Sequence, residues 1–545
     1  MRRLTDGLVV AATAALLLGC ILPQGRWPTG DAAHLLGIAA RLARELATLE
    51  LGELVFHWSS LLAPHPPGGY LFAMLPSLAG AGRHAGPVAG VLALALTWHG
   101  LRLLVGRDRF PPLAAWALLL STPLLWLAVE HTWWDLLAAG CAAATLGHLR
   151  ASEGLTHRGH SVAFGAFMGL GFLTKYTFPM FVVLPTLWAG LGLAARRRGL
   201  RGLVSSLAAF AVLAGPWYAS RFTKVRRYLV DSTDPNSATV DAASTPLTQA
   251  ELLQPENLAY YPAVLVEGLG WPGLILLGLG VLLGLRHPGG RLALLGALGG
   301  LAILSLTGQR QARYLIPALP LLALALDAGL RFRHNAPKAL AALAVLGICL
   351  PATWCTARMW TWIERPPSNR PHDPGLDSLA VWGAWPWPAE GFRPVSSDPD
   401  AWLIDQALAQ MGELVGDTPQ TIGLYLDERS GGPETGFYIW WAEALGHPWD
   451  VATVMTKGRG GEPLAFVGPF AGDDWPPKEF AGLYSVRRPQ DSDLRRLVAL
   501  LDASEVSSLP LPNGYEGTLW RVPDTTWQRA NRPLVPPPPP PGQQP

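Results

Sequence analysis

Two aspartates at the ends of apolar segments are the residues best suited to chemistry. Asp31 lies in the first polar loop of the chain, and Asp135 begins a long apolar segment after the polar and aromatic stretch 130–134. A carboxylate at the mouth of a membrane helix bundle is costly to desolvate, so it usually serves a function. Two such carboxylates facing one cavity would allow acid–base chemistry at the bilayer surface, on a substrate that arrives through the lipid.

Four basic or titratable side chains could bind an anion beside these acids. Lys175 is a lone cation between two apolar segments. Arg310 and Arg313 precede another apolar segment on the predicted outer side, where positive charge runs against the positive-inside rule. Because a guanidinium pairs with two phosphate oxygens at once, these arginines indicate a phosphate. His65, held by the Pro-Pro pair that follows it, could donate to a phosphate or orient a metal.

Each of these residues also has a structural explanation, which the sequence leaves open. Asp31 and Asp135 both stand where helices are expected to start, and Asp is a preferred capping residue there. The Lys175 ammonium could reach the interface on its aliphatic stem, and the two arginines could bind lipid headgroups. The three titratable groups Glu130, His131 and Asp135 are nevertheless more than helix capping requires.

The composition indicates a membrane protein. The chain has 545 residues, of which 50% are hydrophobic and only 15% charged, whereas soluble domains carry about 25% charged residues. The net charge of +2 indicates nothing about partners, and the absence of basic patches with interleaved aromatics predicts no nucleic-acid partner. The four cysteines lack metal-ligand spacing, so neither zinc nor a disulfide framework is indicated. An uncleaved first helix explains the start better than a secretory or lipoprotein signal, because many apolar spans follow it.

The apolar runs predict about eleven crossings, with the N-terminus in the cytoplasm and the C-terminus outside. Basic loops between the runs are assigned to the cytoplasm. The stretch 68–83 is short and broken by Pro76, Gly80 and Gly82, so it is expected to be a half-embedded helix. The predicted crossings lie near 7–23, 86–105, 111–129, 135–149, 161–174, 178–195, 202–219, 263–285, 291–307, 314–331 and 338–358.

The outer side then holds the first loop, a loop at 220–262 and the C-terminal part of the chain. Residues 31–48 alternate apolar and charged types at helical spacing, which predicts an amphipathic helix on the membrane surface. After about residue 400, helices and strands alternate, as in a small α/β domain. The expected helices there are 400–414, 437–445 and 492–503, and the expected strands are 421–426, 450–455, 464–468, 482–487 and 518–522. The domain boundaries follow as a transmembrane catalytic domain at 1–360, an extracytoplasmic α/β domain at 361–530 and a disordered Pro-rich tail at 531–545.

Several short motifs stand in order along about residues 1–360. They are Gly30-Asp31 with Ala40-Arg41, His65-Pro66-Pro67-Gly68-Gly69-Tyr70-Leu71, Asp135 after an aromatic turn, Leu173-Thr174-Lys175-Tyr176, Gly215-Pro216-Trp217-Tyr218 and Arg313-Tyr314-Leu315-Ile316-Pro317-Ala318-Leu319-Pro320. Their order resembles the GT-C superfamily of glycosyltransferases that use polyprenyl-phosphate sugars. The nearest branches are the proteins similar to dolichyl-phosphate-mannose protein mannosyltransferases and the aminoarabinose transferase of lipid A.

The resemblance implies a mechanism in which a sugar on a polyprenyl phosphate enters an outer cavity from the lipid. Asp31 would be the general base on the acceptor, and Asp135 would position the acceptor or the sugar. Lys175 and Arg313, assisted by His65 and Arg310, would bind the departing phosphate. Where the aminoarabinose transferase has a Glu-Lys pair, this chain has Pro64-His65, so no required metal and no cofactor are predicted.

The sequence therefore predicts a multi-pass protein of the inner (plasma) membrane. Its expected activity is transfer of a monosaccharide from a polyprenyl-phosphate donor to a lipid, glycan or protein acceptor outside the cytoplasm. A transporter or flippase is the alternative, but transporter folds often show internal repeats and broken midplane helices, and this sequence shows no repeat. A non-catalytic assembly protein would leave the outer aspartates and Lys175 without a role.

Overall fold

The structure is a computed structural model that divides the chain into two compact units, each considered separately. The helical unit comprises Met1–Gln24 and His57–Ser396, and the mixed unit comprises Gly25–Phe56 and Ser397–Pro545. The residues described are 2–22, 31–52, 54, 66–106, 111–130, 134–196, 199–231, parts of 254–306, 312–330, 349, 403–416, 421–426, 450–455, 465–467, 480–487, 492–511 and 515–523.

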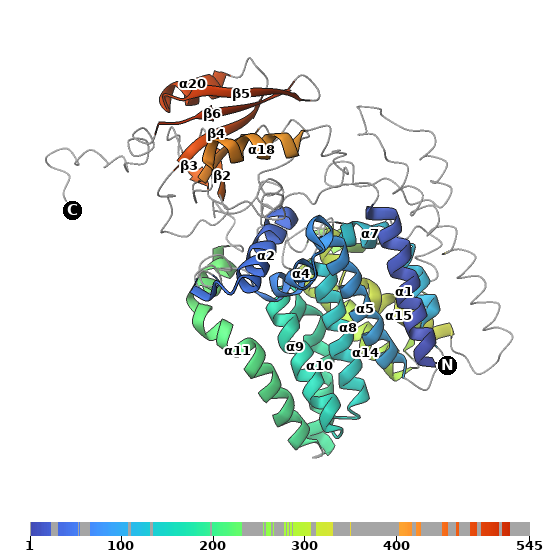
Figure 1. The fold of residues 1–545 in the computed structure, drawn as a ribbon. Helices are drawn as coiled ribbons and strands as arrows, with labels where there is room; N and C mark the ends of the chain where they lie inside the picture. Colours follow the sequence, from blue (N-terminus) through green and yellow to red (C-terminus); the bar gives the residue numbers. More distant parts are fainter. Residues whose placement is uncertain are drawn as a thin grey trace. The chain divides into compact units, whose positions relative to one another are not determined.

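The helical unit is a bundle of apolar helices that pack side by side (Figure 1). Several helices are apolar enough for a membrane, and within the described residues Leu4–Ile21, Ala85–Val105, Leu200–Arg226 and Pro288–Ser305 are also long enough to cross it. The membrane fold is thus as expected, while the count of about eleven crossings stays a prediction. The helices are α1 (Arg2–Ile21), α4 (Gly68–Leu78), η2 (Gly82–His84), α5 (Ala85–Val105), α6 (Leu113–Leu120), α7 (Pro123–Glu130), α8 (Trp134–Ala151), α9 (Arg158–Thr174), α10 (Phe178–Arg196), α11 (Leu200–Asp231), α14 (Pro288–Ser305), η4 (Ala312–Leu315) and α15 (Ala318–Leu330).

Helix α8 is the core of this bundle, because every residue from 135 to 149 is buried. Its sequence is rich in Ala and Gly, and small residues let helix backbones approach closely in a membrane. The tightest approach is to α5, where a Cβ added at Gly100 would stand 2.2 Å from the carbonyl carbon of Ala143. Gly147 also has little room, since its added Cβ would lie 2.7 Å from the Gly100 oxygen.

Replacing Gly100 by Ala is expected to destabilise the bundle by about 1–3 kcal/mol, the usual effect of overpacking a core. The matched control is Gly190→Ala in α10, where an added Cβ meets nothing within 4 Å. That change should leave the midpoint of thermal unfolding in detergent unchanged or slightly higher, because Ala favours helix over Gly. Equal midpoints for the two variants would contradict this assignment of the α5–α8 contact.

Two expectations about the helices are wrong in detail. The run 111–129 is not one helix: it breaks between α6 and α7, because Pro123 offers no N–H to continue α6 and instead occupies the first position of α7. The loop expected from residue 220 begins later, since α11 continues to Asp231.

Helix α4 has 11 residues, about 16 Å, which is too short to cross a bilayer alone and agrees with a half-embedded segment. The predicted spans at 263–285 and 338–358 lie largely outside the described residues.

The mixed unit contains a six-stranded sheet in the order β3-β2-β1-β4-β6-β5. Strand β1 pairs in parallel with β2 and β4, while the remaining neighbours are antiparallel. A Cβ at Gly482 would meet Leu414 of α18, whereas the adjacent Leu483 packs with Leu497 of α20. Because successive strand residues point to opposite faces, the two helices cover opposite faces of the sheet. The elements are α2 (Asp31–Ala47), α18 (Ile404–Val415), β1 (Thr421–Leu426), β2 (Asp450–Met455), β3 (Ala465–Val467), β4 (Phe480–Arg487), α20 (Ser492–Leu500), β5 (Ser504–Leu511) and β6 (Tyr515–Arg521).

The sheet confirms most of the elements expected in this part of the chain. The predicted helix at 31–48 is α2, and its place on a membrane surface stays a prediction. Strand β5 was not expected, because its polar sequence is that of an exposed edge strand, where Pro510 is tolerated. The helix expected at 437–445, the tail at 531–545 and the boundary near 360 fall outside the described residues, so the domain limits also remain predictions.

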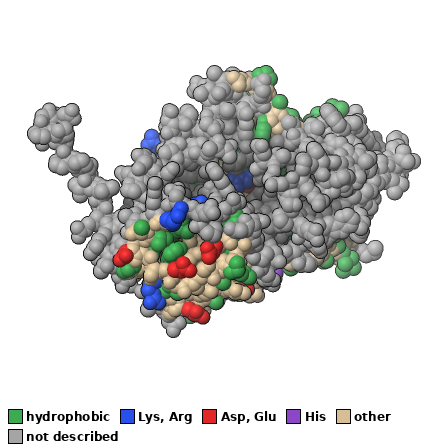
Figure 2. Space-filling model, turned by 90° about the horizontal axis from the view of Figure 1, so that it is seen from above, with side chains coloured by type: hydrophobic (Ala, Val, Ile, Leu, Met, Phe, Trp, Pro, Cys, Tyr) green, Lys and Arg blue, Asp and Glu red, His purple; other side chains and the backbone are tan. Residues whose placement is uncertain are grey.

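The described surface of the mixed unit differs from that of the helical unit. In Figure 2, acidic and basic side chains lie among hydrophobic ones on the part of this unit that faces the viewer. In the helical unit, by contrast, α10 and α11 expose large apolar side chains such as Trp188, Leu191 and Val212. Such apolar exposure fits lipid contact, and the mixed charge fits contact with water.

Candidate functional site

Asp135 and Lys175 form an ion pair where two helices of the helical unit end. Helices α8 and α9 are joined by a short turn, so the first residues of α8 lie beside the last residues of α9. The Lys175 Nζ donates to Asp135 Oδ2 at 2.5 Å. The Asp135 side chain is 1% exposed and that of Lys175 is 21% exposed, so the ammonium retains access to a ligand while the carboxylate is buried.

Tyr314 brings a second cation to the pair. The Lys175 Nζ stands 4.6 Å from the centroid of the Tyr314 ring, and the guanidinium carbon of Arg313 stands 5.7 Å from the same ring. Both distances lie within the range of cation–π attraction. Arg313 and Tyr314 belong to η4, a short 3-10 turn that precedes α15. Two cations and one carboxylate therefore gather around one aromatic ring, an arrangement suited to an anionic ligand such as a phosphate.

The Gly-Gly-Tyr sequence at the start of α4 places this helix against the same end of α8 and α9. A Cβ at Gly69 would lie 2.2 Å from the Trp134 indole, and one at Gly68 would lie 2.6 Å from the Leu173 oxygen. Tyr70 meets Trp134 edge-to-face at 4.4 Å between ring centroids. Only glycine leaves room for these contacts, so the motif holds α4 against Trp134 and Leu173, which lie close in sequence to Asp135 and Lys175.

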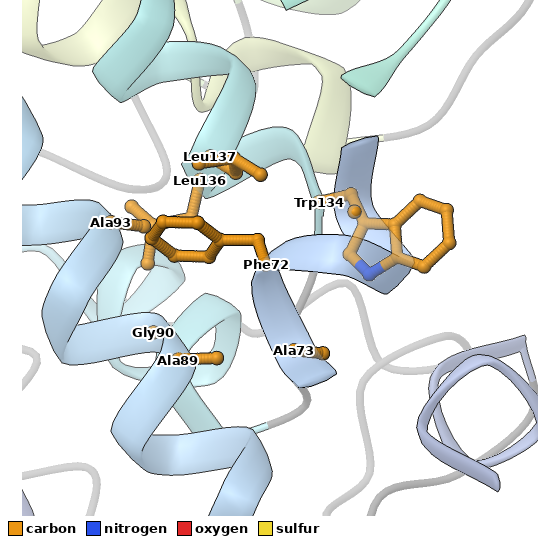
Figure 3. A pocket seen from close by; sticks show the side chains of 9 residues that line it. Phe72, Ala73, Ala89, Gly90, Ala93, Trp134, Leu136 and Leu137 are labelled. Atoms are coloured by element: carbon orange, nitrogen blue, oxygen red, sulfur yellow. The ribbon is translucent and has the colours of Figure 1, made fainter. Parts of the chain in front are cut away.

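A small apolar cavity lies behind Trp134. Figure 3 shows Phe72 beside Ala93 and close to Leu136 and Leu137, with the Trp134 ring turned away from them. All of its lining residues are apolar or glycine: Gly69, Phe72, Ala73, Ala89, Gly90, Ala93, Trp134, Leu136 and Leu137. This cavity therefore reflects helix packing and offers no polar group to a substrate.

One oxygen of Asp135 has no hydrogen-bond partner among the described residues. Oδ1 is buried and, within the described residues, accepts no hydrogen bond. A buried carboxylate oxygen without a donor is rare, and a bound ligand or water is one explanation for it. Its neighbour Oδ2 accepts from Lys175, so Oδ1 is the oxygen that could accept a hydrogen bond from a hydroxyl or amino group of a ligand.

The structure brings together three of the predicted site residues: Asp135, Lys175 and Arg313. The Asp135 carboxylate pairs with the Lys175 ammonium. Helix capping alone therefore does not describe Asp135, and an unpaired ammonium at the interface does not describe Lys175. Asp31 is the first residue of α2 in the mixed unit, so its position relative to this pair stays a prediction. His65 and Arg310 lie outside the described residues.

The sequence assigned no role at the site to three aromatic residues, although signals for them existed. Tyr70 and Tyr314 stand within the motifs given above, and Trp134 directly precedes Asp135. Within the described part of the chain, no three His, Cys, Asp or Glu side chains are grouped to hold a metal ion. Because His65 is not among those residues, the expectation of no required metal is still a prediction.

Comparison with known proteins assigns the fold. The sequence matches no protein-family model and no curated protein. The structure is similar to the crystal structure of ArnT from Cupriavidus metallidurans bound to undecaprenyl phosphate, with a TM-score of 0.55 and 16% identity over 94% of this chain and 97% of that chain. The apo crystal structure of the same protein gives a TM-score of 0.55 and 15% identity, over 95% of this chain and 98% of that one. The chain thus has an ArnT-like fold over nearly its whole length, which confirms the resemblance expected from the motifs.

Proposed function

We propose that this chain is a membrane glycosyltransferase that moves a monosaccharide from a polyprenyl-phosphate donor to an acceptor outside the cytoplasm. The acceptor in this proposal is a lipid, a glycan or a protein. The proposal is supported by the shared fold with ArnT, an aminoarabinose transferase whose crystal structure holds undecaprenyl phosphate. The observation that carries it is the gathering of Lys175, Arg313 and Asp135 at one end of the helical unit.

The two cations supply what the departing phosphate needs. As the bond between the anomeric carbon and the phosphate oxygen breaks, its electron pair stays on the phosphate, and negative charge grows there. Lys175 and Arg313 are placed to stabilise that charge, which is the largest catalytic term in many enzymes. We assign His65 and Arg310 to additional phosphate contacts on the basis of their positions in the sequence.

The two aspartates, Asp31 and Asp135, have different roles in the proposed reaction. Asp31 removes the proton of the acceptor hydroxyl or amine as that atom bonds to the anomeric carbon, with inversion. Asp135 orients the Lys175 ammonium through Oδ2 and offers Oδ1 to a hydroxyl of the sugar or of the acceptor. The leaving group is already a good one, so the mechanism requires neither a metal nor a cofactor. The protein would act in the inner (plasma) membrane, with its C-terminal α/β domain outside the cytoplasm.

The decisive experiment uses the purified full-length protein reconstituted in liposomes. It supplies labelled undecaprenyl-phosphate monosaccharides together with lipid, glycan and peptide acceptors, and follows both label on the acceptor and label inside the vesicle. Transfer to an acceptor supports the proposal and identifies the acceptor class. Movement of the label across the membrane without any transfer would instead favour a transporter.

Replacing Tyr314 by Leu is expected to weaken donor binding by about fivefold, since a partly desolvated cation–π contact contributes about 1 kcal/mol. Tyr314→Phe keeps the ring face over which the Lys175 ammonium lies and should bind the donor nearly as well as the wild type. Titration of a fluorescent polyprenyl-phosphate analogue into the purified protein measures both. Similar losses in the two variants would show that the ring face is not what holds Lys175.

A further inference from the structure

Helix α11 is longer than a membrane crossing requires. It runs from Leu200 to Asp231, 32 residues, or about 48 Å at 1.5 Å per residue. The hydrocarbon core of a bilayer is only about 30 Å thick. For a helix along the bilayer normal that enters the core near Leu200, the hydrocarbon ends near Ser220, and the last three turns pass through the level of the lipid phosphates.

The exposed side chains of α11 change character at that height. Along the first part of the helix, Val204, Leu207 and Val212 are exposed, and Val212 reaches 73%. Beyond Ser220, the exposed side chains include Lys224 and Arg226, with Arg221 half-buried between the two regions. We call these three residues the basic extension. Going outward, a bilayer offers first acyl chains, which suit exposed apolar side chains, and then phosphates, which suit exposed positive charge. The side chains of α11 follow the same order.

Contacts between α11 and α9 show which end of the bundle the basic extension adjoins. Ser206 Oγ donates to the Ser161 oxygen at 2.7 Å, and the Tyr218 hydroxyl donates to the Phe172 oxygen at 2.7 Å. The two helices therefore run in the same direction (Figure 1), and α9 ends immediately before Lys175.

The extension also keeps contact with this end of α9. Val225 packs in one cluster with Leu173, Trp217 and Ala214, so its buried side faces protein and its basic side chains face away. The basic extension thus rises beside the Asp135–Lys175 end of the helical unit, whichever side of the membrane that end faces.

We infer that the basic extension binds the phosphate groups of anionic membrane lipids and concentrates such lipids beside the candidate site. The exposed Phe222, at 65%, stands among the basic residues and can enter the upper acyl region while Lys224 and Arg226 meet the phosphates. An anionic bilayer surface is the partner that matches both the positive charge of the basic extension and its position at the level of the lipid phosphates. The inference goes beyond the proposed function and does not depend on sugar transfer.

The test places an environment-sensitive fluorescent amino acid at the exposed position Thr223 of the full-length protein. The protein is reconstituted in phosphatidylcholine vesicles that contain either brominated phosphatidylglycerol or brominated phosphatidylcholine, since bromine quenches only nearby fluorophores. We expect the anionic lipid to quench about fivefold more strongly per molecule than the neutral one, from the attraction of the basic residues. The excess should fall as salt is raised.

Matched variants separate a binding surface from a general effect of charge. Lys224→Gln with Arg226→Gln should reduce the excess quenching to near unity, while the charge-preserving pair Lys224→Arg with Arg226→Lys should retain it. Arg201→Gln removes an exposed charge at the other end of the same helix and should change nothing at Thr223. Equal quenching by the two lipids in the otherwise wild-type protein, or an excess that survives the double Gln change, would overturn the inference. None of these outcomes bears on whether the protein transfers sugar.

Discussion

Replacing Asp31 by Asn is expected to lower the rate of sugar transfer by about 10²–10⁴-fold, the usual contribution of a general base. Asn cannot take the proton of the acceptor, but it keeps the size of the side chain and one acceptor oxygen. Because Asn suits a helix start almost as well as Asp, α2 should lose no more than about 1 kcal/mol of stability. The initial rate with labelled donor, together with the midpoint of thermal unfolding, measures both effects.

The matched control for Asp31 is Asp405→Asn. Asp405 also lies in the first turn of a helix of the mixed unit, α18, and its side chain is exposed. This variant should transfer sugar at the wild-type rate. If Asp31→Asn behaved like it, the role of Asp31 would be limited to starting α2, and another group would have to accept the proton.

Replacing Lys175 by Met is expected to lower kcat/KM by about 10²–10³-fold, because the leaving phosphate loses a charge that stabilises it. The same change leaves the Asp135 carboxylate buried without its partner. Loss of one member of a buried ion pair costs about 3 kcal/mol or more, so this variant should also unfold at a lower temperature.

The double change Asp135→Asn with Lys175→Met separates these two effects. No unpaired charge is then left buried, so the double variant should recover most of the free energy of unfolding that Lys175→Met loses. Transfer should stay as low as in Lys175→Met, because the phosphate still lacks its ammonium. A pair that only held the helices together would instead recover activity along with stability.

The ion pair between Asp6 and Arg102 provides the matched control. These residues belong to α1 and α5, and their side chains meet at 2.8 Å with Arg102 7% exposed. They lie near the end of α5 where α8 finishes, away from Asp135, as shown by the contact of Arg150 with the Leu103 oxygen. Arg102→Met should lower the unfolding temperature while the transfer rate per folded molecule stays unchanged.

The local pattern of the sequence was enough to predict most helices and strands. Apolar runs in lipid must hydrogen-bond their backbone polar groups within the protein, and a helix is the simplest way to do so. Hydrophobic periodicity located α2 and the strands β1, β2 and β4 from the sequence. The residues able to do chemistry stood out because charge is rare beside such runs: Lys175 and Asp135 were both singled out in this way.

The tertiary structure decided how these residues meet. Asp135 and Lys175 are 40 positions apart, and they pair because α8 and α9 are antiparallel neighbours of nearly equal length. Tyr314 comes from a third segment, and no pattern within that segment reveals that its ring lies 4.6 Å from the Lys175 ammonium. The last turns of α11 beyond residue 220 also pack against α9, through Val225 and Leu173. Side-chain types follow from the sequence alone, but the distances that turn them into a site are set by contacts between segments far apart in the chain.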